Sequence, residues 1–174
     1  MPNLEQLKQF AEEMAEKHYV AASNRKTRPR FPKLEDNIQI LIQAYQSTNE
    51  EVKSKGNIIP AAEWLLDNFY IIEEQYKEIQ YSIKKDLYRN LPILSKGQYS
   101  GFPRVYGIAA GMVEHLDGRM EEDIIVPFLE GYQKHSPLTS KELWAFPIML
   151  RMCLLDRIKD IAVYISETIS LRKQ

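Results

Sequence analysis

The sequence has one cysteine, few glycines and no long uninterrupted apolar run. Because Cys153 is the only cysteine among 174 residues, no internal disulfide can form, which predicts a reducing compartment. Cys153 itself is predicted to be a small buried side chain rather than a reactive thiol. The longest nearly apolar window, residues 144–155, is interrupted by Pro147 and Arg151 and is too short to cross a bilayer. These features predict a soluble chain.

The sequence also lacks a dominant charge and an export signal. The formal net charge of −1 gives no global field that would attract nucleic acid or an anionic membrane. Residues 1–10 lack the basic start and apolar core of a signal peptide, which predicts a cytoplasmic location. With 44% hydrophobic and 27% charged residues, the composition is that of an ordinary globular protein. We therefore expect one domain, residues 1–174.

Apolar residues recur three and four positions apart along most of the chain, which predicts amphipathic helices. Pro60 suits the first turn of a helix, and Thr139 to Glu142 have the form of a capping box. Gly107 and Gly111 would allow a neighbouring backbone to come close. No strand pattern is convincing, so the predicted fold is all-α, an irregular bundle of six to seven helices. The expected helices cover residues 4–19, 34–52, 60–83, 86–90, 104–116 and 120–133, and a last helix that starts at 139 and runs through 169 almost to the C-terminus, with an extended connector at 24–33 and a loop at 95–103.

No motif points to a catalytic or metal site. His18, His115 and His135 are scattered and lack partners at ligand spacing, so no metal is expected. The glycines near residue 100 lack the preceding strand and following lysine of a phosphate-binding loop, so no cofactor is expected. Paired glutamates such as Glu73-Glu74 are interpreted as solvated charge. We assign no catalytic residue and expect no activity of this chain alone.

One stretch of the chain is strongly basic. It could contact the phosphates of lipid headgroups, or it could be a solvated linker that pairs with acidic helices. Phe31 alone gives too little aromatic surface for stacking several bases, so nucleic acid is not an expected partner. The candidate membrane-surface residues are Arg25, Lys26, Arg28, Arg30 and Lys33.

Four ordered blocks stand out along the chain: residues 60–69 with 73–75, 87–92, 103–109, and 137–145 with Leu150-Arg151. Together they resemble the N-terminal region of bacterial cyclic β-1,2-glucan synthases, and the resemblance spans roughly residues 15–172. That family consists of very large inner-membrane proteins that use UDP-glucose to build a protein-linked β-1,2-glucan and close it into a ring. Their transferase and phosphorylase-like parts lie beyond the resembling region, and the chain stops at Gln174, before either part.

The resemblance implies a cytosolic, non-catalytic domain, or a piece of a parent protein, at the inner face of the inner membrane. The leading hypothesis is an accessory domain that organises or regulates the synthase by packing on its other domains. One alternative is a carbohydrate-binding module that holds the growing β-glucan. A second alternative is attachment to the inner-membrane surface through the basic stretch. No catalytic residue is carried over from the family.

A set of polar residues lies beside the apolar stripes and forms the candidate binding or structural cluster. These side chains either lock helices together as buried pairs or line a groove for glucan or a partner domain; we favour locking. Arg104 and Arg151 are each expected to pair with a carboxylate, Glu63 or Glu142. Four aromatic residues, Trp64, Phe69, Tyr106 and Trp144, are expected in the core. The set is Glu63, Asn68, Arg89, Arg104, Tyr106, Glu142 and Arg151.

Overall fold

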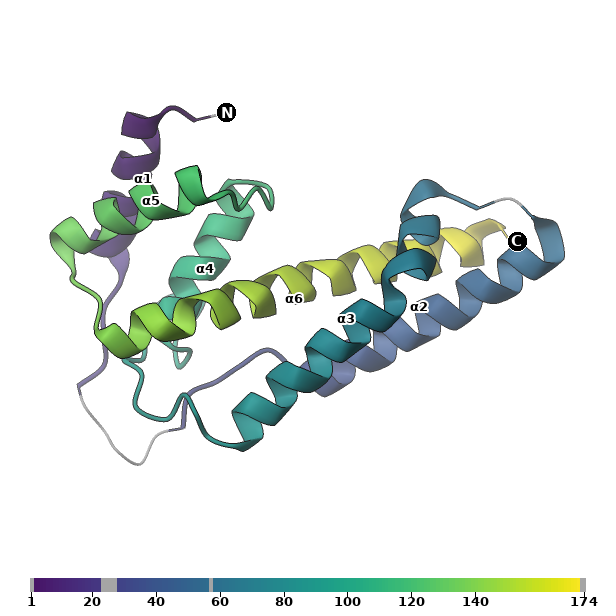
Figure 1. The fold of residues 1–174 in the computed structure, drawn as a ribbon, viewed down its shortest axis with the longest axis horizontal. Coiled ribbons are helices and arrows are strands. Elements are labelled where there is room, and N and C mark those ends of the chain that lie inside the picture. The colour runs from purple at the N-terminus through teal and green to yellow at the C-terminus, as the bar shows by residue number, and fades with distance from the viewer. Residues whose placement is uncertain (1, 23–27, 57, 173–174) are drawn as a thin grey trace. The chain divides into compact units, whose positions relative to one another are not determined.

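The computed structural model describes residues 2–22, 28–56 and 58–172 (Figure 1). Within these ranges the chain forms six α-helices and no named strand, which confirms the predicted all-α class. Two isolated bridges, Val20 with Leu94 and Ile93 with Pro103, are the β-type pairings recorded there. The helices are α1 (Leu4–Lys17), α2 (Leu34–Lys55), α3 (Pro60–Lys84), α4 (Arg104–His115), α5 (Glu122–His135) and α6 (Ser140–Arg172).

The chain divides into two compact units. The first unit contains residues 1–30 and 88–153, and the second contains residues 31–87 and 154–174. Helix α6 therefore supplies its first part to one unit and its second part to the other. That residues 1–174 fold as a single domain stays a prediction.

In the first unit, α1 packs against α5 and α4 is largely buried. The α1 side chains Leu7, Ala11 and Ala15 face the core, as do Phe128 and Tyr132 of α5. Helix α4 is short and rich in small and apolar residues, so most of its circumference can be covered by neighbours. This burial places its first residue, an arginine, inside the unit.

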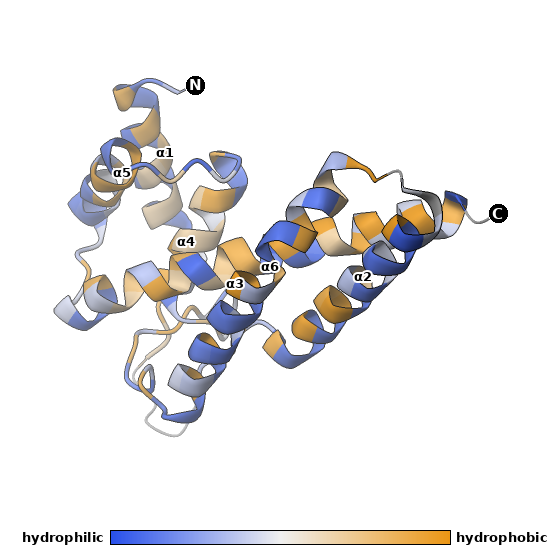
Figure 2. Cartoon of the chain, turned by 45° about the vertical axis from the view of Figure 1, so that its right-hand side comes forward, coloured by the Kyte–Doolittle hydropathy of each residue, from blue (hydrophilic) through white to orange (hydrophobic). Residues whose placement is uncertain are grey.

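In the second unit, α2 packs against α3 and both contact the C-terminal part of α6. Figure 2 shows hydrophilic and apolar residues alternating along α2 and α3, as expected for helices with one buried face. The Tyr76 hydroxyl donates a 2.7 Å hydrogen bond to the Leu155 carbonyl, and the Asn37 amide donates a 2.9 Å bond to Asp156. Burial raises the pKa of Tyr76, with the charges of Asp156 and Asp160 adding to this effect. One buried and one part-buried hydrogen bond therefore tie α6 to its neighbours here.

The helix ends agree with the sequence signals except at residues 86–90. Thr139 and Glu142 form the predicted capping box at the start of α6, and Gly56 ends α2 with a left-handed φ of 70°. The expected short helix at 86–90 is wrong, because these residues form turns after α3. Asp86 has a φ of 59°, a conformation that cannot continue a right-handed helix.

The close backbone approach that was expected at α4 occurs instead on α5. A Cβ atom at Gly107 or Gly111 would meet side chains, Leu94 and Met14 respectively. A Cβ atom at Gly131 would lie 2.9 Å from the carbonyl oxygen and 3.0 Å from the Cα atom of Lys8 in α1. Glycine is therefore required where α5 crosses the backbone of α1.

Among the described residues, no helix is long and apolar enough to span a membrane.

Candidate functional site: the buried Arg104 cluster

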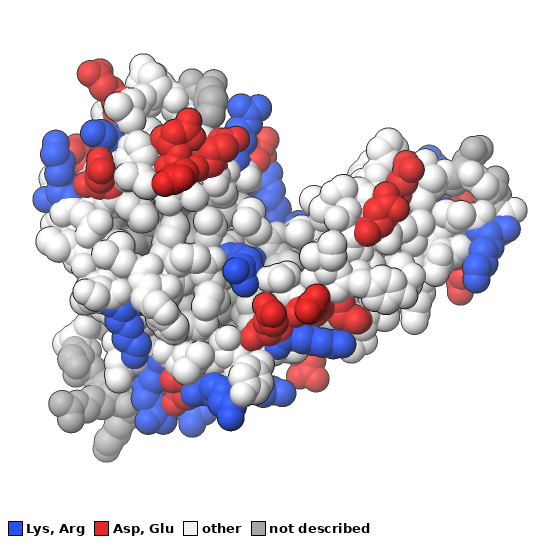
Figure 3. Space-filling model, viewed as in Figure 1, with Lys and Arg blue, Asp and Glu red and all other residues white. Residues whose placement is uncertain are grey.

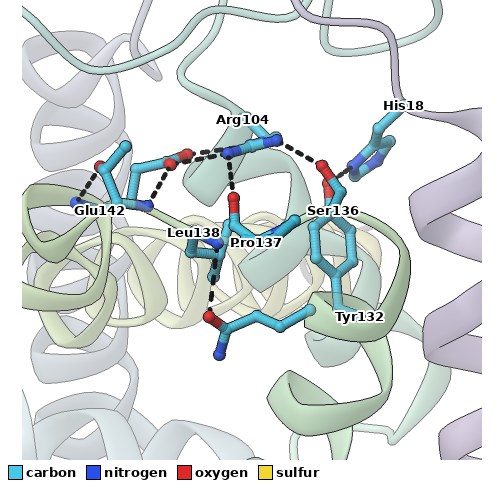
Figure 4. Close-up of polar contacts among 9 residues, drawn as sticks. His18, Arg104, Tyr132, Ser136, Pro137, Leu138 and Glu142 are labelled. Atoms are coloured by element: carbon cyan, nitrogen blue, oxygen red, sulfur yellow. Dashed lines mark hydrogen bonds and ion pairs between the residues drawn. The ribbon is translucent and has the colours of Figure 1, made fainter.

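The centre of the first unit holds a bidentate ion pair between Arg104 and Glu142 (Figure 4). Arg104 is the first residue of α4, and its backbone N–H donates to the Pro92 carbonyl. Its Nε donates to Glu142 Oε2 at 2.9 Å, and its Nη2 donates to Glu142 Oε1 at 2.7 Å. Two parallel charge-assisted bonds of this kind fix both the distance and the orientation of the partners. The pair therefore joins the start of α4 to the start of α6.

The remaining donors of Arg104 hold the link between α5 and α6. Nη1 donates to the Ser136 hydroxyl at 2.7 Å, and Nη2 donates to the Pro137 carbonyl at 3.2 Å. The Leu138 N–H donates to the Gln133 side chain at 3.3 Å. One guanidinium group therefore holds three elements together: α4, the link formed by residues 136–139, and α6.

Glu142 has a second role as the helix-capping residue of α6. Its Oε1 accepts a 3.0 Å hydrogen bond from the Thr139 N–H, while its own N–H donates to the Thr139 hydroxyl at 3.1 Å. The carboxylate is completely buried. It lies in the first turn of α6, where free N–H groups and the helix dipole favour negative charge. The capping box and the arginine together neutralise and hydrogen-bond this buried carboxylate.

His18 and Tyr132 extend the cluster toward α1. The Nδ1 atom of His18, just after α1, lies 2.8 Å from the hydroxyl of Tyr132 on α5. Burial, reinforced by the positive charge of Arg104, lowers the pKa of His18 to about 4. Burial also raises the pKa of Tyr132 to about 12. Both side chains are therefore neutral near pH 7, beside the charged pair.

Glu142 keeps the guanidinium ionised. Burial alone would lower the pKa of Arg104, but the hydrogen bonds and the negative charge of Glu142 outweigh this effect and raise it. The acceptors of Arg104 come from the protein itself, so this arrangement serves to lock elements together. The predicted pairing of Arg104 with Glu142 is present in the structure. Among the described residues, no group of three or more histidine, cysteine or carboxylate side chains could hold a metal.

Of the predicted set, Arg104 and Glu142 make the contacts described above, and the other residues are placed as follows. Tyr106 is buried and packs beside Tyr99 and Phe102, with ring centroids 5.7 Å and 5.0 Å away. In the second unit, the Asn68 amide donates to the Trp64 carbonyl within α3, and Glu63 is exposed on the same helix. Phe69 and Tyr106 are core residues, as expected.

The structure places the remaining members of the set and corrects the expectation for the two tryptophans. Arg151 is exposed on α6 and Arg89 is exposed after α3, and the pairing of Arg151 with a carboxylate stays a prediction. Glu63 is not the partner of Arg104, because Glu142 occupies that position. Trp64 and Trp144 are 42% and 56% exposed rather than core residues. Helical spacing shows on which face of a helix an apolar side chain lies, but only the packing of neighbouring helices decides which face is buried.

The basic stretch is only partly described. Arg25 and Lys26 lie outside the described residues, whereas Arg28, Arg30 and Lys33 are exposed. The Arg30 guanidinium carbon lies 5.5 Å from the centre of the Phe102 ring.

Sequence reasoning did not find His18, Tyr132 or Ser136 as members of the cluster. His18 and Tyr132 are 114 positions apart, so no local spacing relates them. The end of an amphipathic stripe at His18 was a weak signal, since a histidine at a helix end can point inward or outward.

The low pKa of His18 predicts a measurable pH dependence of stability. An unfolded histidine takes up its proton near pH 6.5, whereas His18 in the folded chain does so at about 4. Between these values the unfolded chain binds more protons, so the free energy of unfolding falls as the pH drops from 6.5 toward 4. We expect the substitution His18→Gln, which keeps a hydrogen-bonding group without this titration, to reduce that fall.

Urea unfolding of both proteins at several pH values between 7 and 4.5 measures this effect. The difference in slope should stay below about 1.4 kcal/mol per pH unit, the limit for one proton, and partial solvent exposure reduces it further. Other titrating groups are common to both proteins and cancel in the comparison. Parallel pH profiles would show that His18 does not titrate differently on folding.

Comparison with known proteins finds one informative similarity. No protein-family model matches the chain. The chain is 33% identical over 141 residues to the cyclic β-(1,2)-glucan synthase NdvB of Rhizobium meliloti (strain 1021). The match covers 80% of this chain but only 5% of that synthase. This similarity places the chain in the cyclic β-(1,2)-glucan synthase family, as a relative of one region of those proteins.

Proposed function

We propose that this chain is a non-catalytic accessory region of a cyclic β-1,2-glucan synthase, which organises or regulates the enzyme by packing on its other parts. The match to a small part of a much longer synthase supports this proposal. The Arg104 cluster also supports it, because its charged groups are internally satisfied and serve to hold the first unit together. The observation that carries the proposal is the outward face of α3.

Helix α3 has apolar side chains on two sides. Its buried side is the core face, made by Ala62, Leu65, Phe69, Ile72, Tyr76 and Ile79. On the outward side, Trp64 is 42% exposed and Ile71 is 60% exposed. These two residues are seven positions apart, so they lie almost on one line along the helix. Exposed large apolar side chains on one face of a helix are typical of protein contact surfaces.

Replacing both outward residues with serine tests this role. In a synthase that contains this region, we expect Trp64→Ser with Ile71→Ser to reduce glucan synthesis from UDP-glucose about tenfold or more, since truncating a contact residue commonly costs 1–3 kcal/mol. The free energy of unfolding of the isolated double variant should differ by no more than about 0.5 kcal/mol from that of the parent chain, because exposed residues contribute little to stability.

The matched control is Val126→Ser on α5, which removes another exposed apolar side chain from a different helix. The control should leave synthesis unchanged. Normal synthesis by the Trp64/Ile71 variant, or an equal loss with Val126→Ser, would exclude the α3 face as the contact surface.

Glucan binding is the second candidate function, favoured by the solvent exposure of both tryptophans. Trp64 has the exposed carboxylate residue Glu63 beside it in sequence, and sugars are commonly bound by aromatic faces next to carboxylates. Titrating the purified chain with β-1,2-gluco-oligosaccharides while following tryptophan fluorescence tests this function. A saturable change that disappears in Trp64→Phe or Trp144→Phe supports glucan binding at that residue. A flat titration to millimolar oligosaccharide rejects it.

A further inference from the structure

Two sequence segments of the first unit contain no carboxylate side chain. Neither residues 17–30 nor residues 88–113 include an aspartate or a glutamate, although the whole chain has 24 of them. The structure joins these segments through backbone contacts. The Ala21 N–H donates to the Ile93 carbonyl, the Ser95 N–H to the Tyr19 carbonyl, and the Arg30 N–H to the Gly101 carbonyl, each at 2.8 Å. In this way the tertiary structure brings the two carboxylate-free segments together.

Basic and aromatic side chains lie together where these two segments meet. The Lys96 Nζ lies 4.7 Å from the centre of the Tyr19 ring, and Arg30 lies over Phe102. A Cβ atom at Gly101 would lie 2.6 Å from the Arg30 Cδ, so the glycine makes room for the arginine stem. We call the set formed by Tyr19, Val20, Arg28, Arg30, Lys96 and Phe102 the basic edge.

The basic edge is open to solvent, and its cations form no ion pair within the part of the chain that the structure describes. Arg28, Arg30 and Lys96 are exposed, and none of them forms an ion pair with another described residue. Tyr19 is 55% exposed and Val20 is 43% exposed. In the view of Figure 3, acidic side chains gather over α1 and α5, at the other end of the same unit. The charge of the first unit is therefore distributed unevenly.

We propose that the basic edge docks on the surface of an anionic lipid bilayer. Cations near a negative surface increase binding about fivefold each, and an exposed tyrosine and valine beside them suit the boundary between headgroups and acyl chains. A single-stranded nucleic acid would need free aromatic faces for stacking. Here a cation lies over one face of the Tyr19 ring and one face of the Phe102 ring, so two partly occupied rings offer less stacking surface than such a platform needs. This proposal does not depend on the accessory function, since it concerns a different surface.

Vesicle co-sedimentation of the full chain tests the proposal. The chain should bind vesicles of phosphatidylcholine with 30% phosphatidylglycerol and leave pure phosphatidylcholine vesicles unbound. Binding should weaken as salt increases, because screening acts on exposed charges. In the triple variant Arg28→Gln, Arg30→Gln and Lys96→Gln, the affinity for the anionic vesicles should fall on the order of 100-fold, because three cations are lost and each contributes about fivefold. Circular dichroism confirms that the variant is folded.

The matched control has the same change in net charge at exposed lysines outside the basic edge: Lys53→Gln, Lys77→Gln and Lys134→Gln. It should bind vesicles within about twofold of the parent chain. An equal loss in both triple variants would overturn the proposal, as would equal binding to both vesicle types. Binding to a short single-stranded RNA without binding to anionic vesicles would assign the basic edge to nucleic acid and also overturn it.

Discussion

Replacing Glu142 with glutamine is expected to reduce the free energy of unfolding by about 3–5 kcal/mol. The substitution removes the negative charge and leaves the guanidinium of Arg104 buried without its counter-ion, which is costly in a protein interior. Glutamine at this position can still accept the hydrogen bond of the capping box. The loss therefore reports the ion pair rather than the helix cap. Because domains are commonly stable by 5–15 kcal/mol, the effect should be large in urea unfolding.

Two further variants separate the roles of Glu142. Thr139→Ala removes the capping hydroxyl but keeps the ion pair, and should cost about 1 kcal/mol. The double variant Arg104→Met with Glu142→Gln removes both charges, so it should be less destabilised than the sum of the two single variants. If Glu142→Gln cost no more than Thr139→Ala, the ion pair would not be the lock between α4 and α6.

Introducing valine at Gly131 is the second change with a large expected effect. The Cβ atom would lie 2.9 Å from the Lys8 carbonyl oxygen, and backbone atoms cannot move aside as a flexible side chain can. We expect a loss of about 3 kcal/mol in stability, at the upper end of the range for overpacked cores. Thermal or urea unfolding followed by circular dichroism measures this loss.

Gly111→Ala is the matched control on the neighbouring helix α4. Its new Cβ atom would meet only the terminal methyl group of Met14, which can rotate away. In a helix, alanine is also more favourable than glycine by about 1 kcal/mol. The free energy of unfolding of this variant should therefore lie within about 1 kcal/mol of that of the parent chain. Similar losses at both positions would show that the α1–α5 crossing is not tighter than the contact of α4 with Met14.

The helices could be predicted because their signals are local. The apolar stripe, Pro60 at a helix start and the Thr139–Glu142 box each act within a few residues, and α3 and α6 begin where these signals indicate. The turn at Asp86 was missed because the sequence before and after it remains compatible with a helix. Its positive φ depends on how the chain leaves α3, which propensity does not encode.

The candidate site could be predicted only in part. Arg104 was expected to pair with a carboxylate, with Glu63 and Glu142 as the candidates, and the structure shows that Glu142, 38 positions away, is the partner. Trp64 and Trp144 were expected in the core because aromatic residues at helical spacing usually are. Their exposure shows that spacing alone does not reveal which side of a helix is covered by another element.

The sequence by itself determined the all-α class, the helix positions and their caps, because backbone hydrogen bonding and amphipathic spacing act over three or four residues. Only the tertiary structure decided which polar and charged residues meet. It brought His18 to Tyr132 and Arg104 to Glu142 in the interior, and it joined two carboxylate-free segments into the basic edge. Contacts between residues distant in sequence depend on how helices pack, and the packing is set by the shapes of whole faces rather than by any local pattern.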